Sequence, residues 1–204
     1  MKAYLCLAAG LVAIASPSIA ATITSEDFEA GAAGWSNNFT SDPGVNSGGF
    51  TRHLGRGGAG ATSSKTFALS GDQTSVNVAF DWYRLDSWDG EFFRATITDG
   101  VNSFTSSSQG QFFDGGPANV YSPNWTDRIA AIGFDFATSA TSITLTFSST
   151  LDQDLSDESW GVDNLVITDN INAVPEPASW AMMIVGFGMA GAATRSRRQK
   201  AVLA

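Results

Sequence analysis

Cysteine and histidine are each present only once in this sequence, as Cys6 and His53. Because Cys6 lies in an apolar leader, the domain that follows contains no thiol and cannot form a disulfide. One imidazole without thiolate ligands argues against a zinc site, and nothing around His53 resembles the nucleophile elbow of a serine hydrolase. We expect His53 to be a strand or loop residue with a satisfied hydrogen bond.

Charged residues are also few, at 15% of the chain, and their two signs are segregated. Residues 21–174 contain 6 basic and 19 acidic side chains, a balance of −13, whereas both chain ends are basic. A domain this acidic repels phosphate backbones and anionic head groups, which argues against a nucleic-acid partner. Calcium or a neutral ligand is compatible with such a charge.

Helical periodicity is absent before residue 178, and turn residues interrupt the chain every few positions. Alternation of apolar and polar residues predicts strands instead, most clearly in Ser75–Tyr83, where Val76, Val78, Phe80 and Trp82 point one way. The other predicted strands are Ile23–Glu29, Gly49–Leu54, Ala61–Leu69, Glu91–Thr98, Ile129–Phe136, Ser142–Ser148 and Gly161–Thr168. These strands predict an all-β domain over residues 21–173, a jelly-roll-like β-sandwich. A closed barrel is the alternative, and the repeats that a β-propeller needs are not seen.

Residues 1–20 have the three parts of a secretory signal peptide. Lys2 provides the positive start, Tyr4–Ala15 the apolar stretch, and Ser18-Ile19-Ala20 the small residues before the cleavage site. Cleavage by a signal peptidase is therefore predicted between Ala20 and Ala21. An uncleaved membrane anchor is the alternative, but the apolar stretch is shorter than the roughly 20 residues that a spanning helix needs.

The other end of the chain combines a Pro-Glu-Pro tripeptide, an uncharged apolar run and an arginine cluster. The run covers residues 178–193; Pro175, Glu176 and Pro177 precede it, and Arg195, Arg197 and Arg198 follow it. As a helix it is roughly 24 Å long, somewhat less than the hydrocarbon core of a bilayer. We expect it to span the membrane, with residues 195–204 as a cytoplasmic tail. A buried core helix is the alternative, which the glycines of the run disfavour.

This arrangement resembles the PEP-CTERM sorting signal, over residues 174–198. The resemblance implies recognition by an exosortase, a membrane enzyme that cleaves near the Pro-Glu-Pro motif in Gram-negative bacteria that make exopolysaccharide. The chain would be held in the membrane by its C-terminal helix before processing. Afterwards it would belong to the cell envelope or the extracellular space.

Acidic residues beside tryptophan mark both ends of the domain, in Ser25-Glu26-Asp27-Phe28-Glu29 with Gly34-Trp35, and in Trp160-Gly161-Val162-Asp163-Asn164. This pairing resembles galactose-binding-like and carbohydrate-binding-module jelly rolls. The resemblance implies that the first and last strands lie side by side and that their acidic residues hold a structural calcium. It bears on the fold more than on the function.

Two further acidic clusters, residues 86–91 and residues 152–160, each contain a tryptophan. Calcium takes six to eight oxygen ligands, and these spacings can provide several of them, although neither cluster matches an EF-hand loop. A solvated acidic turn is the alternative. The candidate calcium ligands in the clusters and the last strand are Asp86, Asp89, Glu91, Asp152, Asp154, Asp157, Glu158 and Asp163.

Tryptophan indicates a second candidate site. Trp88 and Trp125 fall in polar loop sequence, where an exposed ring can stack on a sugar, whereas Trp82 is expected in the core. Capping of the core is the alternative role for the two loop tryptophans.

The sequence therefore favours a non-catalytic, exported β-sandwich that binds polysaccharide, calcium or both. No cofactor other than a structural calcium is predicted, and exopolysaccharide is the expected partner. The second hypothesis is a hydrolase of extracellular polysaccharide that uses carboxylates among Asp86, Asp89, Glu91 and Glu158, although so acidic a chain contains suitably spaced pairs by accident. The third is a structural matrix protein that binds only its own kind.

Overall fold

The structure, a computed structural model, describes residues 19–44, 48–110, 120–122, 125–171, 183–192 and 195. The chain divides into two units, one formed by Ile19–Ile171 and the other by the two chain ends, Met1–Ser18 and Asn172–Ala204.

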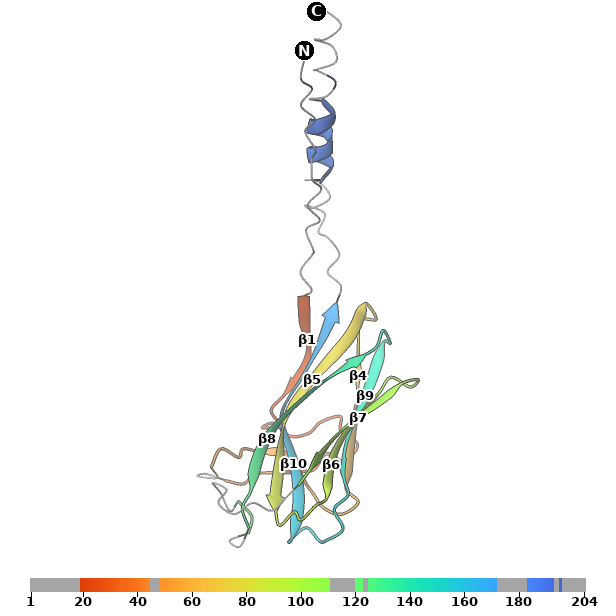
Figure 1. The fold of residues 1–204 in the computed structure, drawn as a ribbon. Coiled ribbons are helices and arrows are strands. Elements are labelled where there is room, and N and C mark those ends of the chain that lie inside the picture. The colour runs from red at the N-terminus through yellow and green to blue at the C-terminus, as the bar shows by residue number, and fades with distance from the viewer. Residues whose placement is uncertain are drawn as a thin grey trace, which may run out of the picture. The chain divides into compact units, whose positions relative to one another are not determined.

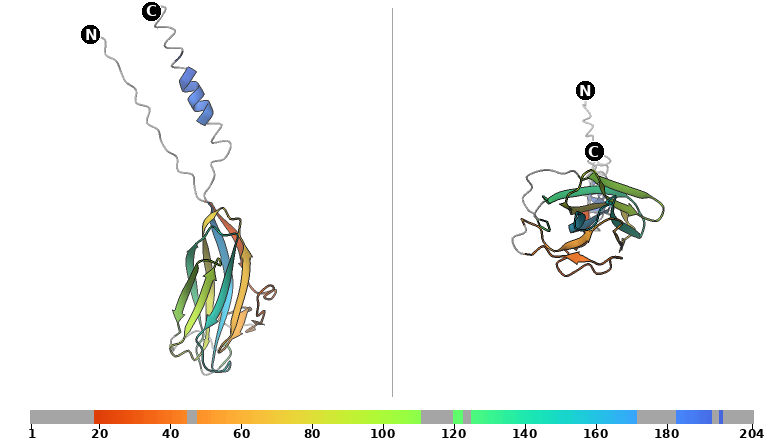
Figure 2. Two further views of the ribbon diagram at one scale, coloured as in Figure 1. Left: turned by 90° about the vertical axis from the view of Figure 1, so that its right-hand side faces the viewer. Right: turned by 90° about the horizontal axis from the view of Figure 1, so that it is seen from below.

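Within the described residues, ten strands form two antiparallel sheets that face each other across one core (Figures 1 and 2). The first sheet has the order β2-β3-β10-β5-β8, with β1 also paired to β10, and the second has the order β4-β9-β6-β7. This arrangement confirms the predicted β-sandwich. The strands are β1 (Ile19–Glu26), β2 (Thr40–Ser41), β3 (His53–Gly57), β4 (Thr62–Ala68), β5 (Gln73–Asp86), β6 (Phe92–Thr98), β7 (Ser103–Gln109), β8 (Arg128–Ala137), β9 (Ser142–Ser149) and β10 (Glu158–Ile171).

The first and last strands lie side by side, as the resemblance to carbohydrate-binding modules implied. Residues 19–26 of β1 pair antiparallel with residues 165–171 of β10. The opposite end of the same edge of β10 pairs with β3. The long strand β10 therefore holds three neighbours in place, β1 and β3 on one edge and β5 on the other.

The core lies between the two sheets and uses the side chains that alternate inward. Val76, Val78, Phe80 and Trp82 of β5 are buried, which confirms the alternation predicted for that strand. They meet the inward residues of β6 and β9; the Trp82 ring stacks on Phe93, with ring centroids 5.2 Å apart. Full burial of each large apolar side chain contributes roughly 1.5–3 kcal/mol, so this layer is the main source of stability.

A second, smaller cluster covers the outer face of the first sheet. Tyr83, which the alternation places on the polar face of β5, is buried there with Phe50 and Leu85. His53 is buried beside Tyr83, and its Nδ1 lies 2.9 Å from the carbonyl oxygen of Thr51. The expected satisfied hydrogen bond of His53 is therefore confirmed.

The sequence-based prediction omits β2 and β7, and it gives other bounds for β1 and β3. Strand β7 was missed because its sequence, SFTSSSQ, lies at a sheet edge with mostly exposed side chains and has no apolar alternation. Strand β3 begins at His53 and not at Gly49, and it contains Gly57. A Cβ on Gly57 would overlap the ring of Trp160, so close packing of that ring requires glycine in a strand where propensity argues against it.

The second unit contains a helix over residues 183–192, within the predicted span 178–193. All of its side chains are exposed, with Ile184 at 70% and Phe187 at 63%. Among the residues that the structure describes, no helix is long and apolar enough to cross a membrane. Pro175, Glu176, Pro177, Arg197, Arg198 and most of the leader lie outside the described residues, whereas Ala20 and Ala21 lie in β1.

Candidate functional site

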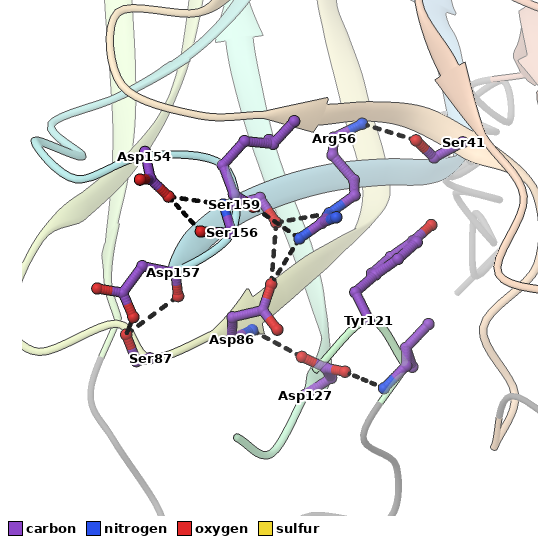
Figure 3. Close-up of polar contacts among 12 residues, drawn as sticks. Ser41, Arg56, Asp86, Ser87, Tyr121, Asp127, Asp154, Ser156, Asp157 and Ser159 are labelled. Carbon is purple, nitrogen blue, oxygen red and sulfur yellow. Dashed lines mark hydrogen bonds and ion pairs between the residues drawn. The ribbon is translucent and has the colours of Figure 1, made fainter. Parts of the chain in front are cut away.

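The two acidic clusters of the sequence meet at one end of the sandwich. One lies on the loop between β5 and β6, and the other on the loop between β9 and β10. Ser87 joins the two loops, because its backbone N–H and its hydroxyl donate to the carbonyl oxygen and the Oδ1 of Asp157, at 2.9 Å and 2.7 Å (Figure 3). The antiparallel register places Glu158 opposite Asp86. Carboxylates about 70 positions apart in sequence thus become neighbours.

Three of these carboxylates converge, those of Asp89, Glu91 and Glu158. One oxygen from each lies within 4.8 Å of the others. Asp89 is exposed and Glu91 is half-buried, whereas Glu158 is fully buried and neither of its carboxylate oxygens has a hydrogen-bond partner. Burial raises the pKa of Glu158 to about 7, and the charges of Glu91 and Asp89 add to this effect.

Glu91 is held in position by its own turn. Its Oε2 accepts hydrogen bonds from the backbone N–H groups of Asp89, at 2.8 Å, and Gly90, at 3.1 Å. Although burial acts in the opposite direction, hydrogen bonds to the Glu91 carboxylate lower its pKa. The turn needs Gly90, whose φ of +145° is a conformation that other residues rarely adopt. The carboxylate of Glu91 is therefore preorganised next to the buried Glu158.

The other predicted calcium ligands have different roles. Asp154 accepts hydrogen bonds from the N–H and hydroxyl of Ser156, and Asp157 binds Ser87, so both shape their loop (Figure 3). Asp152 is exposed on the same loop. Asp163 is buried in the outer cluster, where its Oδ2 accepts hydrogen bonds from Tyr83 and Thr51. These four carboxylates do not join the three that converge.

Asp86 belongs to a buried ion-pair network that the sequence did not suggest. Arg56 donates to its Oδ2 at 2.9 Å and to the carbonyl oxygen of Leu155 at 2.7 Å, and the guanidinium lies 4.1 Å from the ring centroid of Tyr121 (Figure 3). The backbone N–H of Asp86 donates to the buried Asp127. Burial and the charge of Asp127 raise the pKa of Asp86 to about 6, despite Arg56. This network holds β3, β5 and the loop before β10 together.

The exposure predicted for Trp88 is wrong. Its ring is fully buried, and its Nε1–H donates to the carbonyl oxygen of Ser159 at 2.8 Å. A backbone acceptor within the core lets this indole leave the surface despite its polar sequence context. Gly110 permits the packing, because a Cβ there would overlap the indole. Trp82 is buried as predicted.

Trp125 is half-buried and lines an open hollow of about 370 Å³. The other lining residues come from the two acidic loops and are Ser87, Asp89, Gln153 and Asp157. An aromatic ring thus lies beside hydroxyl, amide and carboxylate groups. Asp89 belongs both to this hollow and to the three converging carboxylates.

Two other surfaces are less suited to a ligand. A hollow of about 570 Å³ at the start of β5 has no aromatic residue in its described lining, and Asp99 there accepts hydrogen bonds from Asn102 and Thr138. The outer face of the second sheet consists mainly of serine and threonine. Its hydroxyls pair across strands, as in Thr66 with Thr144 and Thr96 with Thr105. The Trp125 hollow is therefore the better candidate.

Solved structures with a similar fold include carbohydrate-binding modules. The CBM22-1 xylan-binding domain of Paenibacillus barcinonensis Xyn10C is 13% identical, covers 78% of this chain and all of its own, and has a TM-score of 0.50. The C-terminal CBM6 of LamC from Zobellia galactanivorans is 11% identical, covers 74% of this chain and all of its own, and has a TM-score of 0.44. The similarity to the CBM22-1 domain shows that the β-sandwich has the fold of a carbohydrate-binding module.

The C-terminal segment is identified directly from its sequence. Residues 173–198 match the PEP-CTERM protein-sorting motif, which confirms the resemblance seen in the Pro-Glu-Pro tripeptide, the apolar run and the arginines. Comparison with curated proteins found no match for the chain. Along the sequence, a β-sandwich with the fold of a carbohydrate-binding module is thus followed by a sorting motif of exported proteins.

Proposed function

We propose that this chain is an exosortase-processed surface or matrix protein whose β-sandwich binds an extracellular polysaccharide without cleaving it. The observation that carries the binding function is the hollow beside Trp125. The sorting motif and the fold support the setting. The predicted signal peptide, with cleavage between Ala20 and Ala21, completes the export route.

A sugar ring offers an apolar face and a rim of hydroxyls, so its binding sites combine an aromatic ring with a few fixed polar groups. Trp125 provides the ring, and Ser87 and Gln153 provide a hydroxyl and an amide. Asp89 and Asp157 add carboxylates that accept hydrogen bonds from sugar hydroxyls. The hydrogen bonds between Ser87 and Asp157 fix the two loops in advance, which reduces the entropy lost on binding.

The same carboxylates are poorly arranged for glycoside hydrolysis. The two catalytic carboxyl groups of a glycosidase flank the scissile bond at roughly 5 to 10 Å. Here one oxygen each of Asp89, Glu91 and Glu158 lies within 4.8 Å of the others, and Glu158 is fully buried. A substrate does not reach the buried Glu158, which supports binding over hydrolysis.

Substitution of Trp125 by Ala tests the polysaccharide site. We expect affinity for xylan, a soluble β-glucan or the producer's exopolysaccharide, measured by affinity electrophoresis, to fall at least tenfold, because a buried aromatic anchor is worth about 2 kcal/mol or more. Thr96→Ala on the hydroxyl face is the control and should bind like the wild type. Equal retention of W125A would refute the site, and release of reducing sugar would favour the hydrolase.

Mass spectrometry of the protein from its producing bacterium tests the sorting route. We expect a mature N-terminus at Ala21 and loss of the segment that follows the Pro-Glu-Pro motif. The uncharged, apolar residues of the helix over 183–192 support a membrane stage before this cleavage, because apolar side chains transfer favourably into a bilayer. Recovery of the chain with residues 178–204 intact would contradict exosortase processing, and Ala20→Arg should block the first cut only.

A further inference from the structure

The three converging carboxylates form a concentration of negative charge with no basic partner in the described structure. The ion pairs among described residues are Arg52 with Asp42, Arg56 with Asp86 and Lys65 with Glu26, all outside this cluster. Isolated burial of an ionised carboxylate is strongly unfavourable. Glu158 is nevertheless fully buried, with both oxygens unpartnered, and one of them faces Asp89 and Glu91.

The spacing of the oxygens fits a particular class of cation. Two oxygens bound to one Ca²⁺ at 2.3–2.6 Å are at most about 5 Å apart, whereas Mg²⁺, at 2.0–2.1 Å, needs them within about 4.2 Å. The three oxygens lie within 4.8 Å of one another, which Ca²⁺ can span, and three protein carboxylates exceed the one or two through which Mg²⁺ is usually bound. A ligand set made only of carboxylates favours a hard cation over zinc or copper.

The structure also separates this site from the calcium that the sequence resemblance implied between the first and last strands. In β1, Glu26 accepts hydrogen bonds from Lys65 at 2.6 Å and from the indole of Trp35 at 2.7 Å. In β10, Asp163 is saturated by Thr51, Tyr83 and the N–H of Asn164. The carboxylates of that region therefore already have protein partners, and only Glu158 lacks them.

We propose that Asp89, Glu91 and Glu158 bind one Ca²⁺, which joins the loop between β5 and β6 to the start of β10. Waters and backbone carbonyls complete the coordination. Asp152 and Asp157 add negative potential, as their effect on Glu158 shows. Because Asp89 also lines the Trp125 hollow, the ion fixes one wall of that hollow. The site does not depend on polysaccharide binding.

Calcium binding is tested on the full exported chain in detergent after treatment with EGTA. We expect equilibrium dialysis with ⁴⁵Ca to give one ion per chain. At 100 times Kd, CaCl₂ should raise the Tm by roughly 5–10 °C, as expected for a domain of this size. MgCl₂ at the same concentration should have a much smaller effect.

Glu158→Gln keeps the shape of the side chain and removes its charge. We expect E158Q to lose calcium binding at least tenfold while its Tm in EGTA is no lower than that of the wild type, because the variant relieves repulsion among the carboxylates. This result distinguishes a lost ligand from a misfolded chain. Asp135→Asn, an equal change of charge on the exposed face of β8, should bind like the wild type.

The proposal is overturned if the wild type shows no calcium-dependent shift at 10 mM CaCl₂, or if E158Q binds ⁴⁵Ca with wild-type affinity. Equal stabilisation by Mg²⁺ would also overturn it, since the site then does not select Ca²⁺. If W125A abolishes polysaccharide binding and E158Q leaves it intact, the polysaccharide site at Trp125 does not depend on the calcium site.

Discussion

Arg56→Met is expected to reduce the free energy of unfolding by about 3–5 kcal/mol, the range for breaking one side of a buried ion pair. Its guanidinium is the basic group bonded to the fully buried Asp86, and Asp127 is buried next to both. Without Arg56, Asp86 loses its counter-ion and Leu155 loses a hydrogen bond to its carbonyl oxygen. Urea unfolding followed by tryptophan fluorescence measures the loss.

The chain provides a matched control for this substitution in Arg52. Arg52 forms an ion pair of similar length, 2.8 Å, with Asp42, but both side chains are substantially exposed. Exposed pairs contribute at most about 1 kcal/mol, so R52M should be nearly neutral. The double variant R56M/D86N should recover part of the loss, because it removes the uncompensated charge. Similar losses of unfolding free energy for R56M and R52M would show that burial of the ion pair does not increase its contribution to stability.

Much of the fold could be predicted from sequence because the two sheet faces have different environments. Alternation in Ser75–Tyr83 and Glu91–Thr98 located β5 and β6, since only one face of each strand reaches the core. Strands in which that contrast is missing have no such alternation. In β7 every residue except Phe104 is polar, and in β3 the glycines are set by packing against Trp160, which lies about 100 residues away.

The sequence predicted that carboxylates form the candidate site, but it identified only some of the residues that converge there. Both acidic clusters were recognised, but which carboxylates converge depends on the pairing of β10 with β5, which places Glu158 opposite Asp86. Asp163 is on the same strand and is directed to the other face, towards Tyr83. The pairing register of β10 with β5 cannot be inferred from any local sequence pattern. Arg56, in a glycine-rich segment, was missed for the same reason.

Trp88 shows a related limit of sequence reasoning. Its neighbours Asp86, Ser87, Asp89 and Gly90 are all turn residues, and local polarity predicted an exposed ring. The ring is buried because the carbonyl oxygen of Ser159, 71 positions away, accepts the indole hydrogen bond. Local polarity alone therefore does not identify an exposed tryptophan, and Trp125 is the better candidate here because it lines the hollow and is only half-buried.

In the calcium-free protein, stability is expected to fall as the pH rises through the pKa of Glu158. Asp89, Glu91, Asp152 and Asp157 surround this carboxyl group, and burial together with their charges raises its pKa to about 7 in the folded state, from 4.5. Between these two values the folded chain holds a proton that the unfolded chain has released, so stability decreases with increasing pH. A shift of this size corresponds to roughly 3 kcal/mol, fully lost above about pH 8.

Comparison of the wild type with E158Q in EGTA isolates this contribution. Asp86, whose pKa is raised to about 6, produces a similar decline in both proteins at lower pH. Between pH 6 and pH 8 we expect the wild type to continue losing stability and E158Q to change little. With saturating CaCl₂ the wild-type decline should disappear, because the bound ion favours the ionised carboxylate that burial otherwise disfavours. Parallel profiles for the two proteins in EGTA would mean that Glu158 is ionised in the folded state without any cation, and that water or another group already compensates its charge.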